Sequence, residues 1–243
     1  MVISHQRGPM YWLRNLTATV NFHWQEQGRQ PVEPFPYMPY PAEYWSQEKL
    51  DRLQGYFEHD FTLDDLPDYL DIVMGFLLTK KRINIPKSRE MLSSWSVCGY
   101  GAWRCQFFES VEFIGQSEKD EKAQGLVKYA NTLYDNQPAW LKERFPLKSG
   151  EAGTKHAIEW KHLSRFIGVP QGARQVASFH PTIYFSDESA HQSDYTETLS
   201  VVAPVARQII CISSAAPGGF GDECEMQTET TCPSTELSSP PSA

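Results

Sequence analysis

The sequence contains no run of eighteen apolar residues, so it predicts no transmembrane helix. Its first residues, MVISHQRGPMYW, lack the apolar stretch and cleavage site of a secretory signal, and we therefore expect no secretion. Cysteine is scarce, odd in number and never spaced C-x-x-C. This predicts reduced thiols and no structural zinc for the five residues Cys98, Cys105, Cys211, Cys224 and Cys232.

Positive charge is also in short supply. The net charge is −8, which argues against polyanion binding over the whole surface but leaves room for a local basic track. With 40% apolar and 13% aromatic residues, the chain has the composition of a globular protein. Its 243 residues suffice for one good-sized domain with extensions.

The composition divides the chain into three parts. Residues 1–60 are rich in proline and aromatics (PVEPFPYMPYPAEYW), which predicts an extended arm whose aromatic side chains pack on something else. Residues 61–221 carry regular apolar patterns. Residues 222–243 (DECEMQTETTCPSTELSSPPSA) are almost free of large apolar side chains, and we expect a disordered tail there.

Strands alternate with helices in the middle part. Short apolar runs predict strands, and the longer stretches 93–110 and 118–144 predict helices, the second with Leu126, Tyr129, Leu133 and Leu141 on its buried side. Residues 166–178 read as polar sequence with short extended pieces. The alternation indicates an α/β fold with a mainly parallel sheet, whose ligands bind beyond the carboxyl ends of the strands. The predicted strands are 82–86, 111–116, 182–188 and 207–215.

The turn KSREMLSSW (87–95) lies between a predicted strand and a predicted helix. Two interpretations are open. A serine can cap the helix with Glu90 near its positive end, as in any strand-to-helix connection. Alternatively the turn binds phosphate, with Lys87 and Arg89 as cations and Ser94 as a magnesium ligand. The glycines of G-x-x-x-x-G-K-[ST] are missing, and Leu92 stands where one would relieve the turn.

Two further polar runs follow predicted strands. In TIYFSDES, Asp187 and Glu188 are either a solvated pair or the acids of a magnesium-dependent phosphoanhydride hydrolase, one for the metal and one for water. In IICISSAAPGGF, a strand runs into Ser213 and Ser214 before a sharp P-G-G turn. Each of the three motifs, the turn 87–95, the acidic pair and the two serines, also has a purely structural explanation. All three together, in this order, favour a nucleotide site.

From about residue 10 to 221 the sequence resembles the large terminase subunit of tailed phages, the ATPase that drives DNA into proheads. The resemblance rests on the aromatic arm, on KSREMLSSW as a deviant Walker A loop, on NQPAWLKERF, IGVPQGARQVASFHPT and IYFSDESAHQ (Walker B), and on ISSAAPGGF as the coupling motif. It implies a P-loop NTPase fold of the RecA/ASCE type, with ATP and Mg²⁺. The implied roles are phosphate binding by Lys87, Ser88 and Arg89; Mg²⁺ binding by Ser94 and Asp187; water activation by Glu188; transition-state stabilisation by Arg89; and coupling by Ser213 and Ser214.

The resemblance also implies partners and one absence. Implied partners are double-stranded DNA, the portal protein, the small terminase subunit and further copies in a ring, in the host bacterial cytoplasm. Two basic stretches could touch DNA: KKRINIPKSR (80–89), better assigned to the nucleotide loop, and KHLSR (161–165), which a solvated helix face explains equally well. Family members continue into a nuclease domain, for which we expect no room after residue 221.

Two rival functions remain. Leu92 in the loop and the missing nuclease are compatible with a truncated, catalytically inactive remnant that at most binds nucleotide, DNA or portal. A superfamily-2-like helicase shares the P-loop core, but we expect no space for its second RecA-like domain. An active motor is the preferred hypothesis.

Overall fold

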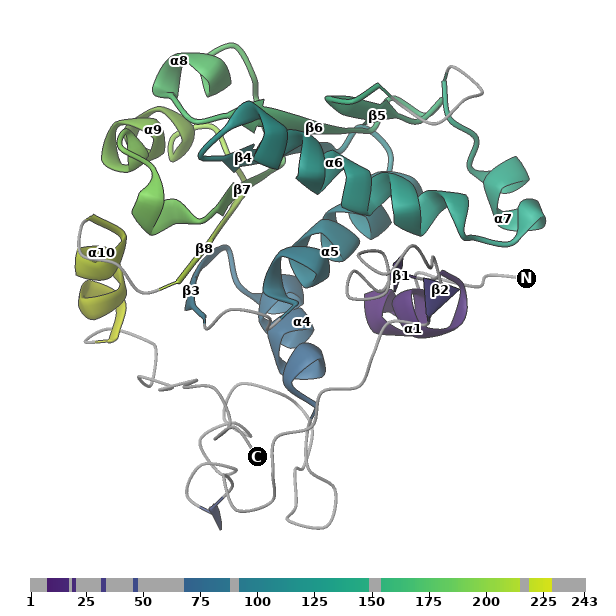
Figure 1. Cartoon of the computed structure of the whole chain (residues 1–243), viewed down its shortest axis with the longest axis horizontal. Helices are drawn as coiled ribbons and strands as arrows, with labels where there is room; N and C mark the ends of the chain where they lie inside the picture. Colours follow the sequence, from purple (N-terminus) through teal and green to yellow (C-terminus); the bar gives the residue numbers. More distant parts are fainter. Residues whose placement is uncertain are drawn as a thin grey trace.

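The computed structural model (Figure 1) describes most of the predicted ATPase part and short pieces of the rest. The predictions for Ser88 and Arg89, for most of the arm, for Cys232 and for residues 229–243 fall outside it. No helix of the described residues is long and apolar enough to cross a membrane. The described residues are 8–17, 19–20, 32–33, 46–47, 68–87, 92–148, 154–214 and 219–228.

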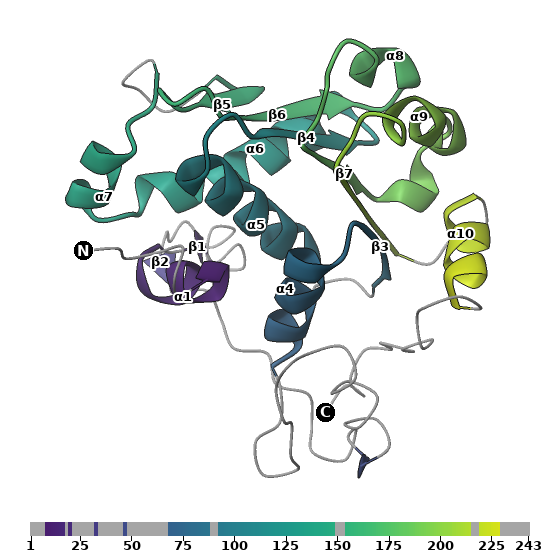
Figure 2. The ribbon, with the colours of Figure 1, turned by 180° about the vertical axis from the view of Figure 1, so that it is seen from behind.

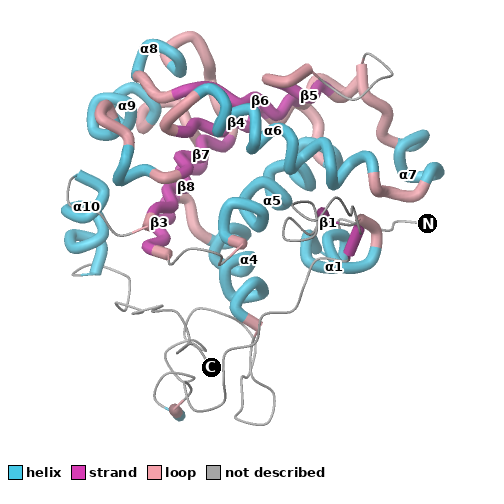
Figure 3. The backbone as a smooth tube through the Cα atoms, in the orientation of Figure 1, coloured by secondary structure: helices cyan, strands magenta, loops and turns pink. Residues whose placement is uncertain are grey.

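Six strands form one sheet in the order β3-β8-β7-β4-β6-β5, a continuous band in Figure 3. The first five run parallel, and β5 pairs antiparallel with β6 at the edge. β7 is buried along its whole length, as expected for a parallel strand covered on both faces. The prediction of an α/β fold with a mainly parallel sheet is confirmed. The strands are β3 (Arg82–Pro86), β4 (Glu112–Ser117), β5 (Ala157–Glu159), β6 (Arg165–Pro170), β7 (Ile183–Asp187) and β8 (Gln208–Ser213).

Helices cover both faces of this sheet (Figures 1 and 2). One core joins α1, α4, α5 and α6 to the sheet, where the rings of Phe113 and Phe166 stack at 4.3 Å. The other joins α8, α9 and α10 to the opposite face around Tyr184. The elements are α1 (Gly8–Asn15), α4 (Tyr69–Thr79), α5 (Ser93–Phe107), α6 (Asp120–Asp135), α7 (Ala139–Arg144), α8 (Ala173–Val176), η2 (Ser189–His191), α9 (Tyr195–Val202), α10 (Gly219–Thr228) and the small antiparallel pair β1 (Thr19–Val20) and β2 (Val32–Glu33).

The long helix predicted over 118–144 is wrong in one respect, because the chain forms two helices, α6 and α7. Pro138 separates them, since it lacks the N–H that a continuing helix needs. The side chain of Gln137 at this break is buried and exchanges two hydrogen bonds with Gln106 of α5, at 2.7 and 2.8 Å. Three predicted core leucines of this stretch are buried, and Tyr129 stacks on Trp95 at 4.2 Å.

The extended pieces expected within residues 166–178 include the strand β6. β6 lies inside the sheet, between β4 and β5. Packing explains the glycine within this strand, because a Cβ on Gly168 would lie 2.5 Å from the backbone oxygen of Ala123 in α6. The interpretation of KHLSR (161–165) as a solvated helix face is wrong, because this stretch forms the turn from β5 into β6. Its last residue, Arg165, pairs with Glu112.

Both ends of the described chain are more structured than expected. Residues 8–15 are the helix α1 instead of an extended arm, and Trp12 and Leu13 are completely buried against the core. Helix α10 continues to Thr228, so the disorder expected from residue 222 is wrong for residues 222–228. Helix α4 was not predicted at all. It is strongly apolar (YLDIVMGFLLT), and Asp68 caps its start by accepting from the N–H of Leu70 at 2.7 Å.

Candidate active site

Three neighbouring strands end at the same edge of the sheet, and the predicted site residues follow them directly. β8 lies between β3 and β7, so Pro86 pairs with Ser213 while Asp187 pairs with Ile212. Lys87 continues this order, since its N–H donates to the carbonyl of Ser213 at 2.9 Å. Parallel strands therefore bring together residues that are far apart in the sequence.

Lys87 and Glu188 form an ion pair across the end of β8. The ammonium Nζ donates to Oε1 of the carboxylate at 2.8 Å, and the two side chains are 9% and 23% exposed. Solvent and salt screen such a pair less than one on the open surface. The predicted phosphate-binding cation and the predicted base are thus each other's partner in this structure.

The second oxygen of Glu188 faces the two predicted coupling serines. Oε2 accepts from the N–H of Ser214 at 3.2 Å and from its hydroxyl at 3.1 Å, with a weaker contact to the Ser213 hydroxyl at 3.5 Å. Ser213 in turn accepts from the N–H of Ala190 at 3.1 Å, and His191 Nε2 lies 3.1 Å from Ser214 Oγ. A change at Glu188 therefore reaches β8 and the turn after β7 through direct contacts.

Ser94 and Asp187 form the second half of the cluster. The Ser94 hydroxyl, in the first turn of α5, donates to Oδ1 of Asp187 at 2.8 Å. Asp187 is the last residue of β7 and is only 9% exposed. The two side chains place hard oxygen atoms next to each other, which is the ligand type that Mg²⁺ prefers.

The two neighbouring carboxyl groups have pKa values that move in opposite directions. Burial raises the pKa of Asp187 to about 6, although the Ser94 hydrogen bond works against it. Burial also acts to raise the pKa of Glu188, but the hydrogen bond and charge of Lys87, with the two bonds from Ser214, outweigh it and lower that pKa. Acids whose environments separate their pKa values are suited to different tasks in one site.

Two residues at this edge have left-handed backbone conformations without being glycine. Leu92 has φ 51° and Glu188 has φ 53°. Each costs about 1–2 kcal/mol relative to the ordinary helical region, so the surroundings must hold them. Leu92 packs against the core, and its carbonyl accepts from both the N–H and the hydroxyl of Ser96. The backbone thus takes the glycine-type conformation at the position where the sequence lacks a glycine.

The turn after β7 carries functional neighbours that the sequence analysis missed. Gln192 donates from Nε2 to the carbonyl of Asp187 at 2.8 Å and to the hydroxyl of Ser186 at 3.1 Å. Ser189 donates to the Ser186 carbonyl at 3.0 Å. These buried groups hold the end of β7 at Ser186 and Asp187. The run SDESAHQ, which is polar except for Ala190, could have marked these residues, but only its acidic pair was used in the prediction.

Lys122 was also missed, and it approaches the acids from α6. The hydrogen bond from its ammonium to Glu118 raises its pKa, and the charges of Glu188 and Asp187 add to this effect. Glu118 directly follows β4, the next strand beyond β7. Nothing in the sequence pattern marks this lysine, because it lies on an ordinary polar helix face.

Within the described ranges, no group of three or more histidine, cysteine or acidic side chains could hold a metal ion. Ser94 and Asp187 supply two oxygen ligands. That number fits Mg²⁺, which usually keeps several waters and takes further ligands from phosphate oxygens, and it does not fit a cage built from protein alone.

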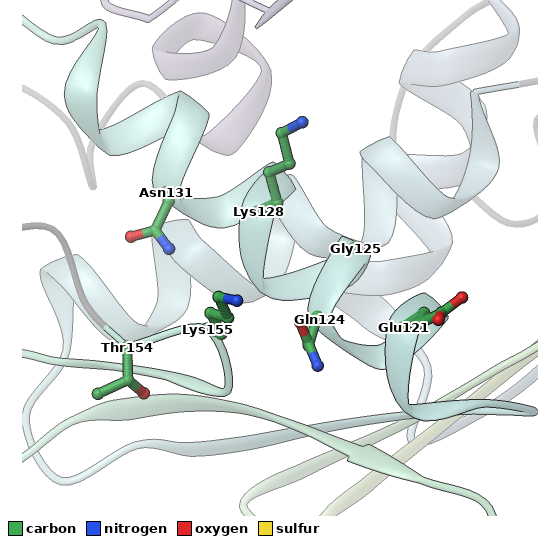
Figure 4. Close-up of a pocket in the computed structure, with 7 residues that line it drawn as sticks. All are labelled: Glu121, Gln124, Gly125, Lys128, Asn131, Thr154 and Lys155. Atoms are coloured by element: carbon green, nitrogen blue, oxygen red, sulfur yellow. The ribbon is translucent and has the colours of Figure 1, made fainter.

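A hollow of about 430 Å³ lies elsewhere, on the outer side of α6 (Figure 4). In the view, the Lys128 amine points away from Thr154, and Glu121 points away from Asn131, so the polar groups do not converge on one ligand position. None of the predicted site residues lines it. The lining residues are Glu121, Gln124, Gly125, Lys128, Asn131, Thr154 and Lys155.

The mainly parallel sheet with helices on both faces is an α/β fold of the RecA-like type. No protein-family profile and no curated protein matches the sequence. Among solved structures, the large terminase of bacteriophage HK97 is similar with a TM-score of 0.56 at 8% sequence identity, over 93% of this chain and 41% of that one. The chain thus spans less than half the length of that terminase.

Two structures of the large terminase ATPase domain of Thermus phage P74-26 are also similar. The R139A mutant has a TM-score of 0.47 at 12% identity over 73% of both chains. The other has a TM-score of 0.46 at 11% identity over 73% of this chain and 72% of that one. The resemblance to large terminases that the motifs indicated is confirmed at the level of the fold, through the HK97 protein.

Proposed function

We propose that this chain is the ATPase motor part of a phage DNA-packaging terminase large subunit, which hydrolyses ATP to translocate double-stranded DNA into proheads. One observation carries the proposal: the residues of the three motifs meet at one edge of a RecA-like sheet. Lys87 contacts Glu188, Ser94 contacts Asp187, and Ser214 of the coupling motif contacts Glu188. By the terminase resemblance, the portal protein, the small subunit and further copies in a ring would be its partners in the host bacterial cytoplasm.

The residues present fit Mg²⁺ and ATP. The N-cap residue of helix α5, Leu92, makes no side-chain cap hydrogen bond, and phosphate oxygens would lie at the positive dipole end of this helix. Asp187 is buried, and burial raises its pKa; a divalent ion bound beside it would favour the ionised carboxylate. Bound magnesium would neutralise charge that develops on the phosphate oxygens during hydrolysis. Ser94 and Asp187 would hold it.

Lys87 and Glu188 would act in sequence. Lys87 would exchange Glu188 for the phosphates, and Glu188 would then regain a higher pKa because its cationic partner has left. As the oxygen of water bonds to the γ-phosphorus and the bond to the leaving ADP oxygen breaks, Glu188 would accept the proton of that water. Glu188 would therefore become an effective general base only when phosphate has bound to Lys87.

The remaining residues have supporting roles in the proposal. Ser213 and Ser214 touch Glu188 directly, so that changes at the base would pass to β8 and the segment after it. Ser88 and Arg89 are assigned to the phosphates by their place in the loop, with Arg89 also stabilising the transition state. The left-handed backbone at Leu92 supports a working loop, because the leucine does not prevent the glycine-type turn.

Binding of a fluorescent ATP analogue by the full chain, with and without magnesium, tests the proposal when phosphate release is followed in parallel. Magnesium-dependent binding together with phosphate release is expected. Binding without phosphate release would favour the inactive nucleotide-binding remnant. Absence of binding in both conditions would reject a nucleotide site altogether.

A further inference from the structure

The start of helix α5 is anchored from two sides by consecutive serines. Ser94 reaches toward β7 and donates to Asp187 at 2.8 Å. Ser93 reaches toward α4, where its hydroxyl lies 3.0 Å from the hydroxyl of Tyr69. Ser93 and Tyr69 are each only 2% exposed, so water does not substitute for this bond. The first contact belongs to the site described above, whereas the second involves an element outside it.

This helix start depends on such external contacts. Leu92, at the N-cap position, has a left-handed backbone, and its side chain makes no cap hydrogen bond to the first turn. A conformation of that kind persists only where neighbouring groups determine it. The Tyr69 hydroxyl is suited to the task, because burial raises its pKa and keeps it protonated.

Tyr69 is itself firmly held. It is the first residue of α4, directly after the cap Asp68, whose carboxylate pairs with Arg14 of α1 at 3.0 Å. Arg14 also binds Asp71, at 3.0 Å. Helix α1 lies close against α5, where a Cβ on Gly99 would approach the side chain of Leu13 to 2.8 Å. The hydroxyl of Tyr69 is thus fixed by a frame of two helices instead of by a loop.

We propose that Tyr69 is a positioning residue for the nucleotide site: through Ser93 it fixes the first turn of α5, and it links the α1–α4 frame to the residues that receive phosphate and magnesium. The ligand part of this inference rests on the proposed function, while the effect on the helix start does not. Because coupling is reciprocal, nucleotide binding at α5 would tighten the contact to α4 as much as that contact favours binding.

The test compares Tyr69→Phe, Ser93→Ala and the double variant with Tyr100→Phe as matched control. Tyr100 is another buried tyrosine, on α5 itself, with one hydroxyl bond to Gln208 at 2.9 Å, so its variant removes a similar contact away from the helix start. Hydrogen exchange without ligand is measured over the first turn, where the Ser96 N–H donates to Leu92 at 2.9 Å. Calorimetry measures the affinity for Mg·ATP.

We expect faster exchange in the first turn of α5 in Tyr69→Phe and Ser93→Ala, and not in Tyr100→Phe. Affinity for Mg·ATP should fall roughly 3- to 10-fold in each single variant, in the range of one lost hydrogen bond. The double variant should be no weaker than the singles, since both remove the same bond.

The outcomes separate this inference from the proposed function. If wild type binds no Mg·ATP, the proposed function fails, and the exchange data alone then decide whether Tyr69 fixes the helix start. Should wild type bind and Tyr69→Phe match it in affinity and exchange, the positioning role is rejected. Equal losses in Tyr69→Phe and Tyr100→Phe would likewise reject it, because they would reflect general stability.

Discussion

The ammonium of Lys87 and the carboxylate of Glu188 lie 2.8 Å apart, although 101 positions separate them in the sequence. The pair joins the ends of two strands that are not neighbours in the sheet, because β8 lies between them. Oε1 of Glu188 accepts from Lys87, while Oε2 accepts from the hydroxyl of Ser214. In the proposed function, Lys87 leaves this pair when it binds phosphate, and the first prediction concerns this lysine.

Lys87→Ala should weaken Mg·ATP binding roughly 10- to 150-fold, since a lost charge-assisted hydrogen bond costs about 1.5–3 kcal/mol. Calorimetry measures the affinity. Lys148→Ala is the matched control, because Lys148 also pairs with a glutamate, Glu159, at 2.9 Å, but on the exposed surface. Equal affinities for wild type and Lys87→Ala would remove Lys87 from the site.

The acidic pair should fail in two different ways. Asp187→Asn should weaken Mg·nucleotide binding and turnover together, because it removes a charged metal ligand. Glu188→Gln keeps shape and hydrogen bonding, so nucleotide should still bind while hydrolysis falls by the ~10²–10⁴-fold typical of a lost general base. Single-turnover hydrolysis and binding are measured side by side. If both variants match wild type in binding and in hydrolysis, the acidic pair has no role in a nucleotide site and is only a solvated pair at the end of a strand.

The pH dependence of stability should reveal Asp187 in metal-free solution. Its folded-state pKa of about 6 lies above the ordinary aspartate value of 3.8 in the unfolded chain, so the folded protein binds more protons between these values. Its contribution is therefore fully present below pH 3.8 and is lost as the pH rises through about 6. At about 1.36 kcal/mol per pKa unit, the loss is roughly 3 kcal/mol.

Urea unfolding of wild type and Asp187→Asn with a chelator, from pH 4 to 7, measures this loss. The difference curve between the two proteins is the relevant quantity, because Glu188 acts in the opposite direction: its lowered pKa supports stability above pH 4.5 and is lost below its folded pKa. Asp187→Asn should be the more stable protein at pH 7. If the difference in unfolding free energy between the two proteins does not change with pH, burial does not raise the pKa of Asp187.

The backbone at Leu92 predicts an unusual order of substitutions. At φ 51°, alanine keeps the backbone strain and loses the packing of the leucine, whereas glycine loses the packing but relieves the strain. Leu92→Gly should therefore be more stable than Leu92→Ala by about 1 kcal/mol, the reverse of the usual order near a helix. Thermal and urea unfolding give the comparison. In the active protein, Leu92→Gly should also raise turnover by relaxing the loop.

The sequence by itself determined the strands and the polar residues at their ends. Apolar runs such as IICI and IYF have few alternatives to a buried strand, and each is followed by polar side chains that, taken together, favoured a nucleotide site. That was enough to predict the parallel sheet and to nominate Lys87, Ser94, the acidic pair and the two serines. It failed at Pro138, a local break between α6 and α7 that the predicted helix 118–144 passed over, and it gave no sign that β6 lies inside the sheet.

Only the tertiary structure decided how these residues meet. The strand order, with β8 between β3 and β7, is not encoded in any local run, yet it sets Lys87 against Glu188 and Ser94 against Asp187. Opposite pKa shifts in adjacent carboxyl groups likewise arise from burial and from partners on other strands and helices. Tyr69 and Ser93 belong here as well: their bond joins two elements whose sequences give no sign of each other, because the contact exists only once α4 packs against α5.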